Sequence, residues 1–137
     1  MSLHALSPLD GRYEEETAPL RDYFSEFAYL RTRARLELDF LSALSKTGLV
    51  RPLTDSERAV LDGLSDGDAR KIQEYEKTTR HDVKAIEYFL REKLPDEFHQ
   101  WIHFGLTSED LNNTAQAIAL RDSRDRVLFP AFDNLLT

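Results

Sequence analysis

The chain has 137 residues, a hydrophobic fraction of 41% and a net charge of −7, so its size fits one domain or a piece of a larger protein. The negative charge argues against a nucleic-acid-binding protein, because binding to phosphates requires a concentrated basic surface. Cysteine is absent, which excludes disulfides and thiolate metal sites, and the lack of a long apolar run or a secretory signal predicts a cytoplasmic protein with no membrane partner.

The first 18 residues are predicted to be irregular, because Ser7-Pro8 and Asp10-Gly11 are turn dipeptides. The same segment places Arg12 beside Tyr13, and an arginine next to a phenol can grip a phosphate. Taken alone, the segment is better explained as an exposed loop with Tyr13 folded onto the core. From Pro19 onward, apolar residues recur at steps of three and four, which predicts a long amphipathic helix that ends at Gly48.

Within this helix lies the most basic stretch of the chain. Arginines at every second position spread around a helix, and acidic residues follow them directly. A solvated, mixed-charge helix face is therefore favoured over a phosphate-binding surface. The residues concerned are Arg31, Arg33, Arg35, Glu37 and Asp39.

The middle of the chain is predicted to hold several shorter helices. Thr54 and Glu57 form a capping box for a short helix, and a further helix is expected from about 68 to 77. An apolar stripe then predicts a helix that ends before Pro95, and residues 97–105 are expected to form a short buried helix. Because no segment shows the period-two alternation of a strand, the fold class is predicted to be all-α.

Thr79-Arg80-His81-Asp82 is the most informative segment. Thr79 and Asp82 fit a capping box, which would place Arg80, His81 and Asp82 in the first turn of a helix. The amide groups there favour a bound anion, arginine offers a planar fork to phosphate or carboxylate, and histidine can donate to an anion or carry a proton. A surface His–Asp pair is the alternative explanation.

A second polar helix start occurs at Thr107-Ser108, where two hydroxyl groups suit a carboxylate or phosphate oxygen. The helix that begins there crosses a charged patch and is expected to bend or break at Pro130. The chain stops inside an apolar periodic stretch, which predicts a truncated polypeptide. No histidine has metal-ligand spacing, so no metal site is predicted, and His103 is expected to be structural.

Three blocks of the sequence, taken together, resemble in order and spacing the N-terminal helical domain of the adenylosuccinate lyases, a family of the fumarase/aspartase superfamily. The resemblance covers nearly the whole chain. Arg80 stands where many relatives have Asn, and Gly105-Leu106 replaces a more usual Ala-Cys. The blocks are Ser7-Pro8-Leu9-Asp10-Gly11-Arg12-Tyr13, the run from Thr78 to Phe89 and the run from Ile102 to Asn113.

The resemblance implies elimination of fumarate from adenylosuccinate, which gives AMP, and from the succinyl-carboxamide ribotide of purine biosynthesis (SAICAR to AICAR). It implies no cofactor, and its partners are these small molecules. It also implies a substrate-binding role for seven residues. These are Arg12 and Tyr13 at the phosphoryl end, the triplet Arg80, His81 and Asp82, and the pair Thr107 and Ser108.

In the family that the chain resembles, the proton-transfer histidine, the serine-bearing loop that supplies the general base and the central helical bundle all lie beyond residue 137. Residues 1 to about 110 are therefore expected to form a substrate-binding domain, and residues from about 111 to 137 the start of the first long helix of that bundle. The whole enzyme is expected to be a homotetramer with shared active sites. The 137-residue chain is expected to be inactive, because His81 is its only plausible proton-transfer group.

Two alternatives stay open at this point. One is another lyase of the same superfamily, such as an argininosuccinate lyase, although the Arg-Tyr and His-Asp-Val-Lys blocks argue against it. The other belongs to a different class of protein, a free-standing helical interaction module in which the motifs have lost their function.

Overall fold

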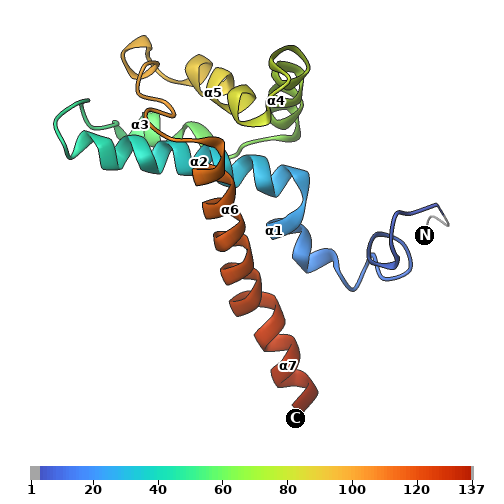
Figure 1. The fold of residues 1–137 in the computed structure, drawn as a ribbon. Coiled ribbons are helices and arrows are strands. Elements are labelled where there is room, and N and C mark those ends of the chain that lie inside the picture. The colour runs from blue at the N-terminus through green and yellow to red at the C-terminus, as the bar shows by residue number, and fades with distance from the viewer. Residues whose placement is uncertain (1–3, 137) are drawn as a thin grey trace.

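The computed structural model describes residues 4–136, and every regular element in that range is a helix (Figure 1). The all-α prediction is therefore confirmed. The elements form two parts in space: a compact group of helices, and a single helical arm that runs away from it toward the C-terminus. The N-terminal segment, with the 3-10 turn η1 (Pro8–Asp10), lies apart from that group.

The long helix predicted from Pro19 is divided in two. A 3-10 turn, η2 (Ala18–Leu20), leads into the short α1 (Arg21–Phe24), and α2 (Glu26–Ser45) follows. Ser25 causes the break, because its backbone is extended (φ −70°, ψ 159°) and its Oγ accepts the amide hydrogen of Ala28 at 3.1 Å. Serine caps a helix well in this conformation, so a second helix begins where an uninterrupted one was predicted.

Residues 49–105 hold α3 (Asp55–Arg58), η3 (Ala59–Leu61), α4 (Asp66–Thr79), α5 (Asp82–Lys93) and η4 (Asp96–Phe98). The predicted Thr54–Glu57 capping box is present, with the Thr54 amide donating to Glu57 Oε2 at 2.7 Å. A second box between Ser65 and Asp68 starts α4 two residues earlier than predicted. The predicted short helix over 97–105 is wrong in part, because only the turn of η4 is regular there.

The core lies where α2, α4 and α5 pack together. The stripe predicted on α5 is buried, with Leu90 at 0% exposure, and Phe98 from η4 closes one side. Full burial of one such side chain stabilises the fold by about 2 kcal/mol. The largest buried apolar side chains of this group are Leu30, Leu41, Ile72, Ile86, Phe89, Leu90 and Phe98.

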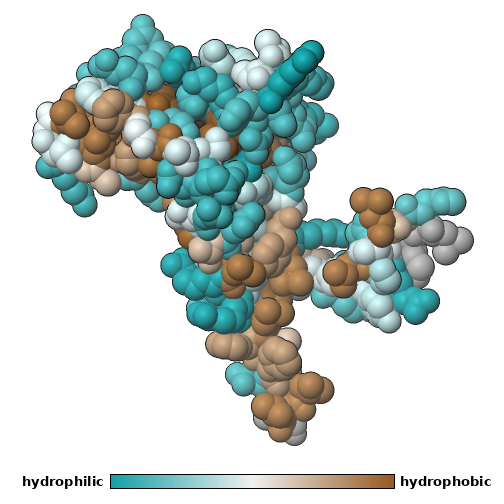
Figure 2. Space-filling model, in the orientation of Figure 1, coloured by the Kyte–Doolittle hydropathy of each residue, from teal (hydrophilic) through white to brown (hydrophobic). Residues whose placement is uncertain are grey.

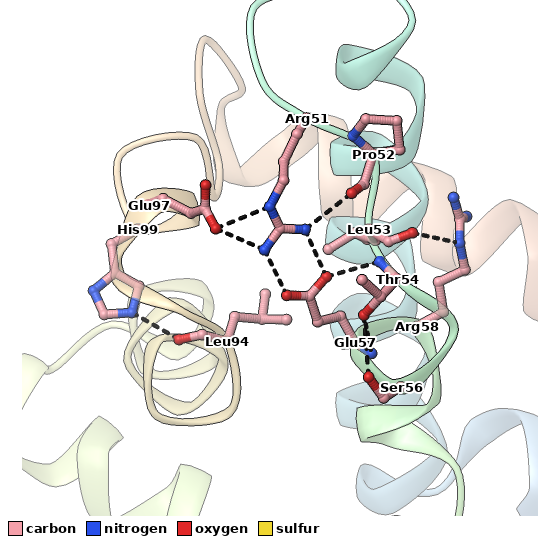
Figure 3. A network of polar contacts seen from close by, with 10 residues as sticks. All are labelled: Arg51, Pro52, Leu53, Thr54, Ser56, Glu57, Arg58, Leu94, Glu97 and His99. Atoms are coloured by element: carbon pink, nitrogen blue, oxygen red, sulfur yellow. Dashed lines mark hydrogen bonds and ion pairs between the residues drawn. The ribbon is translucent and has the colours of Figure 1, made fainter.

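Arg51, in the connector after α2, ties two separate segments together (Figure 3). Its guanidinium bonds to both oxygens of Glu57 at 2.7 and 2.9 Å and to Oε1 of Glu97 at 2.6 and 2.9 Å. It also lies 4.5 Å from the centroid of the Phe98 ring. The start of α3 is thereby fixed against the turn that follows α5.

The C-terminal arm consists of α6 (Ser108–Ser123), a π-helical segment η5 (Arg124–Leu128) and α7 (Phe129–Leu136). Of the bend or break predicted at Pro130, the break does not occur, since α7 continues through this residue. Instead the hydrogen-bond pattern changes just before it, with the amide of Phe129 donating to Arg124 O. A π-turn shifts the backbone register close to the point where proline can donate no hydrogen bond.

The arm exposes apolar side chains along α7, visible as brown surface at its lower end in Figure 2. Leu135 is 79% exposed, and the exposed set also includes Leu128, Phe129, Phe132 and Leu136. Among the helices of residues 4–136, none combines the length and apolar character that crossing a lipid bilayer requires.

Candidate functional site

Two of the polar segments singled out in the sequence meet in the structure. Ser108 Oγ, at the start of α6, lies 3.3 Å from Nε2 of His81, at the start of α5. These residues are 27 positions apart in the sequence, so tertiary packing brings them together. We refer to His81, Asp82, Thr107 and Ser108 as the corner.

The turn between α4 and α5 differs from the prediction. Helix α4 continues to Thr79, Arg80 adopts a left-handed conformation with φ 52°, and α5 begins only at Asp82. The N-cap is His81, whose Nδ1 accepts the amide hydrogen of Lys84 at 3.3 Å. The predicted Thr79–Asp82 capping box is therefore wrong, because the Thr79 hydroxyl bonds to the main chain of His81 instead.

The cap determines how the His81 ring is oriented. Because Nδ1 accepts a hydrogen bond from a backbone amide, the proton of the neutral ring belongs on Nε2. Nε2 can then donate to Ser108 Oγ, which leaves the Ser108 hydroxyl hydrogen free to donate to a ligand oxygen. The corner thus has two linked hydrogen-bond donors: His81 Nε2 donates to Ser108, and the Ser108 hydroxyl can donate to a ligand.

Asp82 faces inward from the corner. Its Oδ2 lies 2.8 Å from Nη2 of Arg33 on α2, and its Oδ1 accepts the amide hydrogen of Val83 at 2.8 Å. Partial burial would raise the pKa of Asp82, but the Val83 amide and the Arg33 charge outweigh it, so this pKa lies below its usual value. Asp82 is therefore ionised at neutral pH and holds the start of α5 against α2.

Thr107 is the N-cap of α6, as predicted, and forms a complete capping box with Asp110. Its hydroxyl both donates to Asp110 Oδ2 at 2.8 Å and accepts from the Asp110 amide at 3.4 Å. The Thr107 hydroxyl is thus occupied by the cap, whereas the next two amides, of Ser108 and Glu109, have no intrahelical acceptor. These amides, together with the Ser108 hydroxyl, are the donors that α6 offers to an anion.

The other predicted site residues are not at the point of contact. Arg80 is exposed next to the corner, and its amide closes α4 by donating to Glu76 O at 2.7 Å. Arg12 and Tyr13 lie on the N-terminal segment, away from the corner in Figure 1. The expectation that Tyr13 folds onto the core is wrong, since it is exposed, with the Arg12 guanidinium 5.9 Å from its ring centroid.

Two residues assigned to a solvated face are instead buried behind the corner. Arg33 is 4% exposed and Glu37 is 0% exposed, whereas Arg31, Arg35 and Asp39 are exposed as predicted. The helical period contained the signal, because positions 33 and 37 continue the apolar stripe on the buried side of α2. The charge of these two side chains concealed that period.

Both carboxylate oxygens of Glu37 contact His103, in the loop before α6. Oε2 accepts the His103 amide hydrogen at 2.9 Å, and Oε1 lies 2.6 Å from the ring Nδ1. Burial raises the pKa of Glu37, although the hydrogen bonds and charge of His103 oppose the rise. This contact ties the loop to the interior of α2, in line with the structural role expected of His103.

The corner lies at the surface of the described residues, where the side chain of His81 is 50% exposed. Three grooves of about 370, 510 and 500 Å³ run along α1, α2 and α6, and neither His81 nor Ser108 lines any of them. Within residues 4–136, no three His, Asp or Glu side chains are grouped so that they could hold a metal ion. The chemistry available at the corner is hydrogen-bond donation to an anionic small molecule.

Comparison with known proteins extends this description. Residues 11–137 match the family described as Lyase. The adenylosuccinate lyase of Haemophilus influenzae is 43% identical over 98% of this chain and 32% of its own length. That of Dictyostelium discoideum is 40% identical over 94% of this chain and 31% of its own length. The chain spans about a third of the length of the curated relatives it matches and corresponds to their N-terminal portion.

Proposed function

The chain belongs to the lyase family, and we propose that it forms the N-terminal, substrate-binding part of an adenylosuccinate lyase. The proposed reaction of the whole enzyme is the elimination of fumarate from adenylosuccinate, which gives AMP. The same elimination from the succinyl-carboxamide ribotide, earlier in purine biosynthesis, is proposed as its second reaction.

One structural observation supports the proposal more than any other. Two separated motif segments place His81 Nε2 within 3.3 Å of Ser108 Oγ, in a chain that matches adenylosuccinate lyases along nearly its whole length. The substrate carries carboxylates and a phosphate, and a cluster of donors at the ends of two helices suits these groups. In this proposal, Ser108 and the first amides of α6 bind substrate oxygens, while His81 orients the serine.

Arg12 and Tyr13 are proposed to bind the phosphoryl end of the substrate, and Arg80 an oxygen near the corner. Their separation in space agrees with active sites that several subunits share, as proposed for a homotetramer. Thr107 and Asp82 are proposed to support the site, because the first holds the start of α6 and the second the start of α5.

The apolar side chains exposed on α7 support the proposed division into domains. We propose that residues up to about 110 form the binding domain and that the helical arm belongs to a bundle, where Phe132 and Leu135 would be buried. Removing a proton beside a carboxylate and expelling an amine needs an acid and a base. We propose that both come from outside these residues, so that the 137-residue chain binds weakly and is inactive.

Isothermal titration of the 137-residue chain with adenylosuccinate and AMP tests the proposal. We expect weak binding of both ligands that is lost in His81→Ala. His99→Ala is the matched control, because its ring lies beside Leu94 O and away from the corner, and it should bind as the wild type does. Binding that His81→Ala leaves unchanged, or fumarate released by this chain in a coupled assay, would contradict the proposal.

A further inference from the structure

We propose that Arg33 and Glu37 of α2 are positioning residues that hold His81 and Ser108 at hydrogen-bonding distance from each other. This inference rests on the proposed function, because that function makes the corner a substrate-binding site. The contact between His81 and Ser108 lies within the chain itself, so its dependence on Arg33 and Glu37 can be tested without substrate.

One face of α2 holds both segments of the corner. Arg33 and Glu37 are four residues apart and therefore lie one turn apart on the same side of the helix. Arg33 Nη2 contacts Asp82 Oδ2 at 2.8 Å, and Asp82 is the residue after His81. Glu37 binds both the amide and the ring of His103, whose turn leads into Thr107 and Ser108.

Two strained backbone conformations lie in these same segments. In residues 4–136, the non-glycine residues with positive φ are Arg80, at 52°, and His103, at 60°. This conformation is unfavourable for a residue with a Cβ atom and persists where surrounding contacts fix it. Arg80 directly precedes His81, and His103 is the residue that Glu37 holds, so both strained positions lie in the segments anchored to α2.

Burying these two charges is a poor route to stability. Burial disfavours the charged form of Glu37, and Arg33 Nε is buried without a hydrogen-bond partner among the described residues. Replacing buried charged pairs by apolar residues of similar volume is often neutral or stabilising. The two charges are therefore better explained by the placement that they impose on the segments they bind.

Nuclear magnetic resonance of the isotope-labelled 137-residue chain tests this role. The readout is the nuclear Overhauser contact between the His81 ring and the Ser108 β-protons, with the His81 ring nitrogen shifts alongside. The variants are Glu37→Leu and Arg33→Met. Glu37→Gln is the conservative variant, because its amide can still accept from the His103 amide and donate to the ring. Arg35→Met is the matched control, since Arg35 is an exposed residue of the same helix.

We expect Glu37→Leu and Arg33→Met to lose the His81–Ser108 contact and shift the His81 nitrogen signals while they keep wild-type helicity and a cooperative urea transition. Glu37→Gln and Arg35→Met should keep the contact. A contact that persists in Glu37→Leu or Arg33→Met removes that residue from the proposal, and persistence in both overturns it. A variant that unfolds would assign a structural role and overturn it too. If adenylosuccinate does not bind the wild type, the proposed function is wrong. The effect of the α2 variants on the His81–Ser108 contact can still be measured in that case.

Discussion

Replacing Asp82 by asparagine keeps the shape of the side chain but removes the charge that faces Arg33. The Arg33 side chain is 5% exposed and would lose the carboxylate that lies 2.8 Å from its Nη2. Stranding a fully buried charge costs about 3–5 kcal/mol. Asp82 is 40% exposed and the Tyr29 ring stays 3.7 Å from the guanidinium, so we expect a smaller loss, about 2 kcal/mol. For a chain of this length the loss corresponds to a fall of roughly 7 °C in Tm.

The pH dependence of this loss identifies its cause. Because the folded-state pKa of Asp82 is lowered, its ionised form contributes stability above the unfolded-state pKa of about 3.9. That contribution disappears as the pH falls through the lowered folded-state pKa. The difference between the wild type and Asp82→Asn should therefore be full at pH 7 and small near pH 2.

Urea unfolding followed by circular dichroism at both pH values measures the difference. Asp125→Asn is the matched control, because Asp125 pairs with the exposed Arg124 next to it, and it should behave as the wild type does. Equal stability of Asp82→Asn and the wild type at pH 7 would show that the Asp82 charge does not stabilise Arg33. A deficit that persists unchanged near pH 2 would lead to the same conclusion, because Asp82 would then act through something other than its charge.

Three further substitutions test the fold. Arg51→Ala should lower the urea midpoint at pH 7, and the effect should fade as the pH falls from about 4.5 toward 2, because Arg51, together with the hydrogen bonds from Thr54, lowers the pKa of Glu57 to about 2. Leu90→Ala should cost about 3 kcal/mol by leaving a cavity at a fully buried position, measured by the same unfolding assay, and a cost below 1 kcal/mol would contradict the core described here. Gly67→Ala in α4 should stabilise by about 0.5 kcal/mol, whereas Gly48→Ala, at φ +82°, should destabilise by about 1 kcal/mol. In differential scanning calorimetry, a lower Tm for Gly67→Ala or a higher Tm for Gly48→Ala would contradict the corresponding assignment.

Local signals in the sequence predicted much of the fold. The apolar stripe of α5 and the capping boxes at Thr54 and Thr107 use contacts within a few residues, and the structure contains them. The sequence did not indicate the break at Ser25, because the apolar period runs through this residue. A serine inside a periodic stretch is not by itself evidence of a helix cap. The start of α5 was misplaced by the choice of Thr79 as the cap in place of His81.

The site was predicted less completely than the fold. Motif segments indicated His81 and Ser108, but their contact depends on packing between α5 and α6, which no local pattern contains. Arg33 and Glu37 were assigned to solvent, because their partners, Asp82 and His103, are distant in the sequence. Charged residues on a buried helical stripe are the pattern that could have pointed to them.

We propose that the corner, through Ser108 and His81, binds the anionic groups of adenylosuccinate. The decisive experiment is a titration of the isotope-labelled 137-residue chain with millimolar adenylosuccinate, followed by amide and histidine-ring nitrogen shifts. We expect the largest changes at the amides of Ser108 and Glu109 and at the His81 ring. Changes that leave these groups unaffected and appear only elsewhere, or no changes at all, would contradict this proposal.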